Sequence, residues 1–223
     1  MHKLTAEDHA RVSAAIAQAE KATDGEIVAV ATDLSDKYHD AAWQWAALAM
    51  FVQMGLWAFV PGLLEDVYHF LFGGWGEVEQ DKLLLTVLML ALAKFLGVWL
   101  ILNWMPLRLL LVPPATKTRR VRRRAIDIYK AGADKRTVRR TGILIYLSMG
   151  EHRAEIIHDE AITKAVAPDA WGEAMIALLG PVKEGRVADG ICAAIGEIGE
   201  VLAKHFPKSV DNPNEIPDKL IEL

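Results

Sequence analysis

Residues 41–64 read AAWQWAALAMFVQMGLWAFVPGLL, and residues 83–105 read LLLTVLMLALAKFLGVWLILNWM. Each stretch reaches the roughly 20 apolar residues that a helix needs to cross the hydrocarbon core of a bilayer. The alternative is a pair of buried core helices, but the rest of this 223-residue chain is too short to surround two such rods. Tryptophans lie near the ends of both stretches, as in the interfacial belts of membrane proteins. The sequence therefore predicts a transmembrane hairpin over residues 39–113, with spans at 41–64 and 83–105.

The charges that flank the two spans predict their orientation. The connecting loop, residues 65–82, carries five acidic residues and one basic residue. The segment after the second span, residues 113–140, carries eleven Lys and Arg against two Asp. Because Lys and Arg near the membrane stay on the cytoplasmic side, we expect a multi-pass protein of the inner (cytoplasmic) membrane with both termini in the cytoplasm.

The remaining chain has the pattern of one α/β domain that the hairpin interrupts. Residues 1–38 form its first part: a helix with a capping box at Thr5 and Asp8, then the continuous apolar strand 26–34. Residues 114–206 form its second part, and residues 207–223 are expected to be a polar C-terminal tail. In this second part the pattern predicts strands 142–148 and 154–158 and helices 118–132, 169–184 and 188–205. The short link between the two strands suits a hairpin.

Carboxylates follow two of the predicted strands. Asp33 and Asp36 come after the first strand, and Glu151 comes after the second. If these strands are parallel, the three side chains gather at the carboxyl edge, where open α/β sheets bind ligands. A divalent cation, Ca²⁺ or Mg²⁺, is the ligand that such a group would take; the alternative is that these side chains are solvated loop residues. The sequence contains no phosphate-binding loop, dinucleotide fingerprint or zinc motif.

The helix at 118–132 carries a basic face that follows directly on the second span. Its arginines are positioned to contact anionic lipid headgroups, and the alternative is that they only fix the topology: Arg119, Arg120, Arg122, Arg123 and Arg124. Nucleic acid is not the expected partner, because no aromatic residues interleave with these arginines and the chain is acidic overall, with a net charge of −4.

One charged residue lies inside the predicted spans. Lys94 is near the centre of the second span, and Gln53 is the polar residue at the same depth of the first. Neither span offers a carboxylate to neutralise the lysine. We therefore expect Gln53 and Lys94 to form a polar pair or a binding site for another membrane protein; a neutral or water-solvated lysine is the alternative.

Several segments together resemble a known family. A GEIVAVAT strand (25–32), an RTGILIYLS strand (140–148), EHRAEIIHDEAI (151–162), a Gly-Arg-Val-Ala-Asp-Gly helix start (185–190), HFP and DNPNEIPD occur in an order that resembles the bacterial membrane branch of the TPM-domain family. The resemblance implies a small mixed-sheet α/β/α sandwich. Relatives of this kind act in photosystem repair or as accessory proteins of membrane receptors; some have been called phosphatases, and some bind divalent metal. No catalytic motif of the family matches residue by residue, so no catalytic residue is assigned.

Two classes of function follow. The first is a non-enzymatic accessory, assembly or adaptor protein of a membrane complex, with the bilayer and another membrane protein as partners and without a cofactor. The second is a membrane-bound phosphatase or other hydrolase that depends on a divalent metal. The sequence favours the first, because it displays anchoring features and no nucleophile beside a base.

Overall fold

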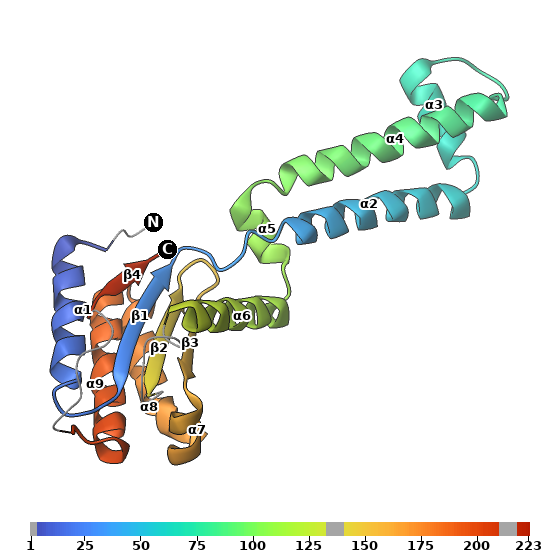
Figure 1. Ribbon diagram of the computed structural model, residues 1–223. Coiled ribbons are helices and arrows are strands. Elements are labelled where there is room, and N and C mark those ends of the chain that lie inside the picture. The colour runs from blue at the N-terminus through green and yellow to red at the C-terminus, as the bar shows by residue number, and fades with distance from the viewer. Residues whose placement is uncertain (1–3, 133–140, 210–217) are drawn as a thin grey trace. The chain divides into compact units, whose positions relative to one another are not determined.

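The protein is described by a computed structural model that covers residues 4–132, 141–209 and 218–223. The chain divides into two compact units (Figure 1). One unit joins Met1–Asp36 to Ala115–Leu223, and the other is Lys37–Pro114. The second unit is therefore inserted between the first and second strands of the first.

The first unit is built on a mixed four-stranded sheet. Its strands are β1 (Glu26–Thr32), β2 (Gly142–Ser148), β3 (Arg153–His158) and β4 (Leu220–Glu222), in the order β3-β2-β1-β4. β1 pairs in parallel with β2 and β4, and β2 pairs with β3 as an antiparallel hairpin. The predicted mixed sheet is confirmed, and its three predicted strands are present.

Strand β4 was not predicted, since residues 207–223 were expected to be a polar tail. Leu220 is buried and pairs with Ala29 of β1. Past the end of the strand, Leu223 N donates to the Ala31 carbonyl, and Thr32 Oγ1 donates to the Leu223 carbonyl at 2.9 Å. Three residues are too few to produce a periodic signal, so only the free edge of β1 explains why this segment is a strand.

Alternate residues of the strands pack against helices on opposite faces of the sheet. Ile27, Ile143 and Ile145 point to one face, where α1 (Ala6–Ala19), α8 (Trp171–Lys183) and α9 (Val187–His205) complete the larger core. The short α7 (Glu160–Ala165) adds Ile162 to this core, and the 3-10 turn η1 (Pro168–Ala170) leads into α8. The predicted capping box of α1 is confirmed, because Asp8 N donates to Thr5 Oγ1 and Thr5 N donates to Asp8 Oδ2.

The opposite face of the sheet is covered by α6 (Pro114–Gly132). Val121, Ala125 and Tyr129 on α6 pack against Val30 and other residues of β1 and β2. The sheet is thus enclosed by helices on both faces, which explains why its central strands are continuous apolar runs.

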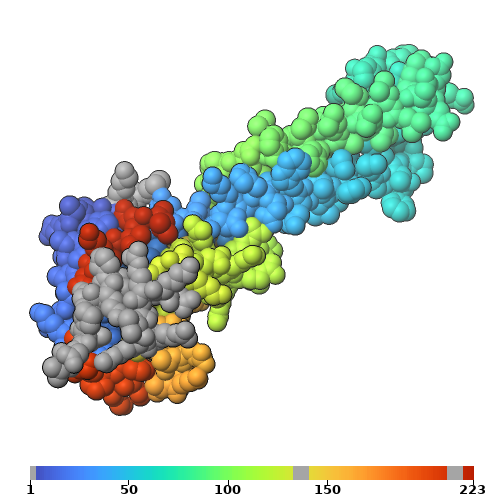
Figure 2. Space-filling view, in the orientation of Figure 1, coloured from blue at the N-terminus to red at the C-terminus, as the bar shows by residue number. Residues whose placement is uncertain are grey.

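The second unit consists of four helices. They are α2 (His39–Phe59), α3 (Leu63–Phe72), α4 (Gln80–Ile101) and α5 (Met105–Leu111). α2 and α4 lie side by side and antiparallel (Figures 1 and 2), since Trp43 near the start of α2 contacts Phe95 and Trp99 near the end of α4. The ring centroids are 5.5 and 6.0 Å apart.

Among the described residues, one helix is by length and composition able to cross a membrane, and it is α4. α2 meets the same criterion only together with α3, and the chain bends by 108° between them. Helix α2 thus ends at Phe59, five residues before the end of the predicted span 41–64. Pro61 explains the break, because its ring excludes Val60 from helical backbone angles and its nitrogen cannot donate a hydrogen bond; Val60 has φ −111° and ψ 100°. Part of the expected loop 65–82 is likewise helical, as α3.

Candidate functional site

The carboxyl edge of the sheet brings together the loops that follow β1 and β2. Met149 N donates to the Thr32 carbonyl at 2.9 Å, and Gly150 N donates to the Asp33 carbonyl at 2.8 Å. A Cβ at position 150 would lie 2.6 Å from the Asp33 oxygen, so this approach requires glycine. The parallel pairing on which the predicted site depended is thus present.

Glu151 is buried at this edge and holds the two loops together. Its carboxylate accepts hydrogen bonds from Ser35 N, at 2.9 Å, and from Ser148 Oγ. Ser35 Oγ in turn lies 3.0 Å from the Tyr146 hydroxyl. Burial raises the pKa of Tyr146, and the nearby negative charge of Glu151 raises it further. Glu151 therefore serves as the acceptor at the centre of a polar network that fixes the edge.

The three carboxylates proposed for a cation site do not converge. Asp33 is exposed, Asp36 forms an ion pair of 3.0 Å with Arg120, and Glu151 faces the serine donors. Within residues 4–132, 141–209 and 218–223, no group of three or more His, Cys, Asp or Glu side chains is arranged to hold a metal ion. The divalent cation stays a prediction that the geometry of this edge does not support.

Four of the five arginines proposed for headgroup contact are exposed on α6. They are Arg119, Arg122, Arg123 and Arg124. Arg120 differs, because it is half-buried and its guanidinium donates to Asp36. Helix α6 therefore has four exposed arginines, and its fifth, Arg120, forms an ion pair with Asp36 in the loop after β1.

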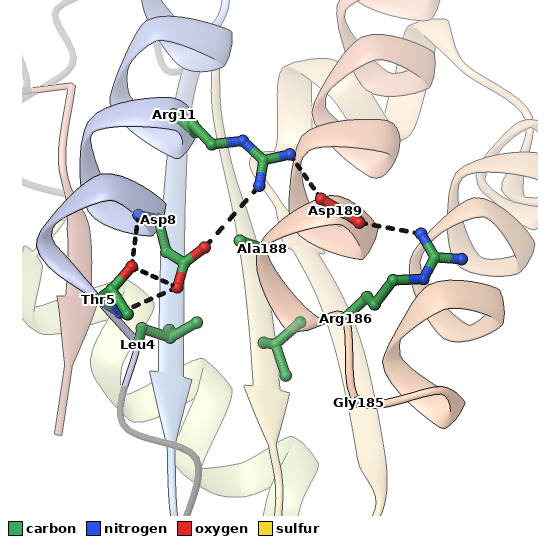
Figure 3. A pocket seen from close by; sticks show the side chains of 9 residues that line it. Leu4, Thr5, Asp8, Arg11, Gly185, Arg186, Ala188 and Asp189 are labelled. Atoms are coloured by element: carbon green, nitrogen blue, oxygen red, sulfur yellow. Dashed lines mark hydrogen bonds and ion pairs between the residues drawn. The ribbon is translucent and has the colours of Figure 1, made fainter.

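A polar pocket of about 330 Å³ lies between α1 and the start of α9 (Figure 3). Asp189 accepts hydrogen bonds from Arg11, at 2.5 Å, and from Arg186, at 2.9 Å. Arg11 also lies 3.8 Å from Asp8. The hydrogen bonds from Arg11 and Arg186 lower the pKa of Asp189. The charges in this pocket largely neutralise one another, and they join α1 to α9.

A group of acidic side chains lies where α1 leads into β1. Glu20 and Glu26 are both buried, and Glu20 Oε1 accepts a hydrogen bond from Ile27 N at 2.7 Å. Burial, the charges of Glu26 and Asp218, and a hydrogen bond with Asp218 raise the pKa of Glu20 to about 8. This group could not be predicted from the sequence, because Asp218 is distant from Glu20 in the chain and lies two residues before the unpredicted strand β4.

The protonated state of Glu20 predicts a pH-dependent stability. Because its pKa in the folded protein, about 8, exceeds the ordinary value of 4.5, folding binds the proton. The resulting stabilisation is complete below pH 4.5 and is lost as pH rises through 8. Glu20→Gln keeps the oxygen that accepts from Ile27 N but removes the ionisation. We expect the change in the free energy of unfolding caused by Glu20→Gln to be more favourable at pH 8.5 than at pH 5, by about 1–3 kcal/mol.

This effect is measured by calorimetric unfolding of the full chain at both pH values. Glu200→Gln, at an exposed position of α9, is the matched control and should show no such difference. Equal effects of Glu20→Gln at pH 5 and pH 8.5 would contradict a proton bound at Glu20.

Gln53 and Lys94 line one cavity in the second unit. The cavity has a volume of about 350 Å³ and is otherwise lined by apolar side chains of α2, α3 and α4. Gln53 is half-buried and Lys94 is exposed. The structure thus places both residues at one site, although no hydrogen bond between them is recorded in the described part of the chain.

Comparison with known proteins gives a match of fold. No family model matches the chain, and no curated protein matches it significantly. The solved NMR structure of the BA42 protein from the psychrophilic bacterium Bizionia argentinensis is similar, with a TM-score of 0.57 and 19% sequence identity. The match covers 100% of this chain and 98% of BA42. At this level of identity the likeness establishes a shared fold.

Proposed function

We propose that this chain is a membrane-anchored α/β domain of the TPM type, and that it acts as a non-enzymatic accessory or adaptor protein of a membrane complex. α2 and α4 are its anchor, and the α/β domain is the part that recognises other molecules. The partners are the bilayer, its anionic headgroups and another membrane protein.

The observation that carries the proposal is the apolar surface of the second unit. In α4, only 11% of the most apolar stretch is buried. Side chains such as Phe51, Leu88 and Leu100 are 63%, 64% and 66% exposed. Burial of apolar surface is worth about 25 cal/mol per Å², and soluble monomers rarely leave patches of this extent in water. A hydrocarbon environment would satisfy these side chains.

The charge pattern supports an orientation for this anchor. The acidic segment 65–82 lies between α2 and α4 in the chain, and the basic α6 begins after the two residues that follow α5. The positive-inside rule then places the α/β domain in the cytoplasm. In that orientation Arg119, Arg122, Arg123 and Arg124 are available to anionic headgroups, at about 1 kcal/mol for each basic residue near the surface.

The family proposal rests on where the resembling segments lie. GEIVAVAT and RTGILIYLS include β1 and β2, and Gly-Arg-Val-Ala-Asp-Gly begins α9. The accessory role is favoured over a metal-dependent hydrolase because Asp36 and Glu151 are engaged with Arg120 and with serine donors. Hydrolysis would need these carboxylates to face a shared metal.

A topology experiment tests the anchor. A reporter enzyme that is active only outside the cytoplasm should be active when fused within Gly73–Gly76 and silent at either terminus, because only the segment between α3 and α4 would leave the cytoplasm. A cytoplasm-specific reporter at the same positions is the control and should give the inverse pattern. Activity of the first reporter at the termini would refute the cytoplasmic placement of the α/β domain.

A further inference from the structure

The cavity between α2, α3 and α4 combines an apolar wall with two polar side chains. Ala49, Trp57, Val67 and Leu90 form part of the wall, and Gln53 and Lys94 are its polar members. Such a composition suits an apolar ligand that carries one acceptor group at a defined position.

Lys94 has no partner recorded among the described residues, although it lies within the most apolar helix. It is the fifteenth of the 22 residues of α4, which places it about 10 Å from the Ile101 end of the helix. Side chains on a helix lean toward its N-terminus, so Lys94 leans over the turn that contains Leu90, away from the nearer end. An isolated ammonium at this depth is unfavourable in a bilayer and is normally paired.

Among the described residues, the helices that line the cavity bring no carboxylate to Lys94. On α3, Asp66 lines a different pocket with His69 and Trp75, and Glu65 lies next to Gly62. Residues 41–59 of α2 and 83–101 of α4 contain no Asp or Glu. A second copy that packs through the same helices brings no carboxylate to this depth either. The carboxylate or phosphate of a lipid lies at the interface and not about 10 Å inside the hydrocarbon. A carboxylate at the depth of Lys94 therefore has to come from another protein.

We propose that a transmembrane helix of another membrane protein packs over this cavity, and that the side chain of an Asp or Glu on that helix enters it and pairs with Lys94. The proposal rests on the proposed membrane anchoring and names the partner by its chemistry. Gln53 lies in the same cavity and offers an amide N–H to the second carboxylate oxygen. Gly97 lies one turn along from Lys94, and a Cβ there would meet nothing within 4 Å, so the backbone of α4 is open to close approach.

The test uses defined peptides as the partner. The full chain, labelled with a donor dye at its N-terminus, is reconstituted in phosphatidylcholine vesicles with acceptor-labelled transmembrane peptides of about 20 leucines and alanines. The peptides carry Glu, Gln or Leu at the central position. We expect the Glu peptide to associate at least about tenfold more tightly with the wild type than with Lys94→Leu, as measured by energy transfer. Lys94→Arg should retain this preference, and Gln53→Leu should weaken it less than Lys94→Leu.

Equal association of the Glu peptide with the wild type and with Lys94→Leu would overturn the proposal, as would equal association of the Glu and Gln peptides with the wild type. Displacement of the Glu peptide by oleate would identify an amphiphile as the occupant and would also overturn it. Extraction with alkaline carbonate distinguishes a failure of the inference about Lys94 from a failure of the proposed membrane anchoring. If carbonate releases the full chain from native membranes, the anchoring itself fails; if the chain stays and the peptides do not discriminate, only the inference about Lys94 fails.

Discussion

Replacement of Arg108 by methionine is expected to lower the free energy of local unfolding at the end of α4 and in α5 by about 3–5 kcal/mol. Arg108 is 3% exposed. Its Nε donates to the Leu102 carbonyl at 2.7 Å, and one terminal nitrogen donates to the Lys37 carbonyl at 2.7 Å. The other terminal nitrogen donates to Asn103 Oδ1 at 3.2 Å. The guanidinium thus joins Lys37, two residues before α2, to the Leu102 carbonyl and the Asn103 side chain at the end of α4, where a cation is also favoured by the helix dipole.

Methionine matches the length of the arginine stem but supplies no donor. The Leu102 carbonyl is a buried acceptor, and the acceptors on Lys37 and Asn103 are partly buried. A buried acceptor that loses its hydrogen bond costs about 1–3 kcal/mol, and a partly buried one costs less. A simple hydropathy argument predicts the opposite sign, because removal of a charge makes the segment more apolar. The hydrogen-bond argument therefore predicts destabilisation and the hydropathy argument predicts stabilisation, so the substitution distinguishes between them.

The measurement is hydrogen exchange of the detergent-solubilised full chain, followed by mass spectrometry of peptides that cover α5 and the end of α4. We expect exchange there to accelerate by about a hundredfold or more, while peptides from β1 and β2 keep their rates. Arg108→Lys should give a smaller acceleration, because a lysine cannot reach three acceptors with a planar fork. Arg123→Met, at an exposed arginine of α6, is the control and should change nothing. Unchanged exchange in Arg108→Met would show that the hydrogen bonds of Arg108 do not hold this region.

The sequence predicted those elements whose signal is local. β1 and β2 are continuous apolar runs, α6 has an apolar stripe at Val121 and Ala125, and the capping box of α1 lies within four residues. Each of these patterns is decided by near neighbours in the chain. The sequence left open whether β1 and β2 are parallel; the structure shows that they are, and their following loops meet at the carboxyl edge.

Features that depend on distant residues were not predicted. Strand β4 forms because β1 has a free edge, and the pKa of Glu20 is raised mainly by burial and further by the charges of Glu26 and Asp218. Arg108 lies beyond the predicted span 83–105, and its burial, with backbone carbonyls as its main acceptors, was not predicted. At the predicted cation site, the loops after β1 and β2 do lie together. The ion pair between Asp36 and Arg120 of α6 could not be predicted, because strand patterns contain no information about contacts with a helix.

Replacement of Gly190 by alanine is expected to destabilise the α/β domain by about 2–3 kcal/mol. Gly190 is buried in the first turn of α9, where this helix crosses α8. A Cβ at this position would lie 2.4 Å from the backbone oxygen of Leu178 and 2.8 Å from Val182 Cγ2. Backbone atoms cannot rotate aside, so the two helices would have to separate, and overpacking of this kind in a dense core is destabilising.

Gly196→Ala is a matched control in the same helix, and it is expected to have the opposite sign. Gly196 is exposed, and a Cβ there would meet nothing within 4 Å. Alanine in a helix is favoured over glycine by about 0.5–1 kcal/mol, so this variant should be slightly more stable than the wild type. The unfolding temperature of the full chain, measured by calorimetry in detergent, should therefore fall for Gly190→Ala and rise for Gly196→Ala. If both variants are more stable than the wild type, helix propensity alone decides the effect at position 190. Gly190, the last residue of the Gly-Arg-Val-Ala-Asp-Gly segment, would then have no packing role.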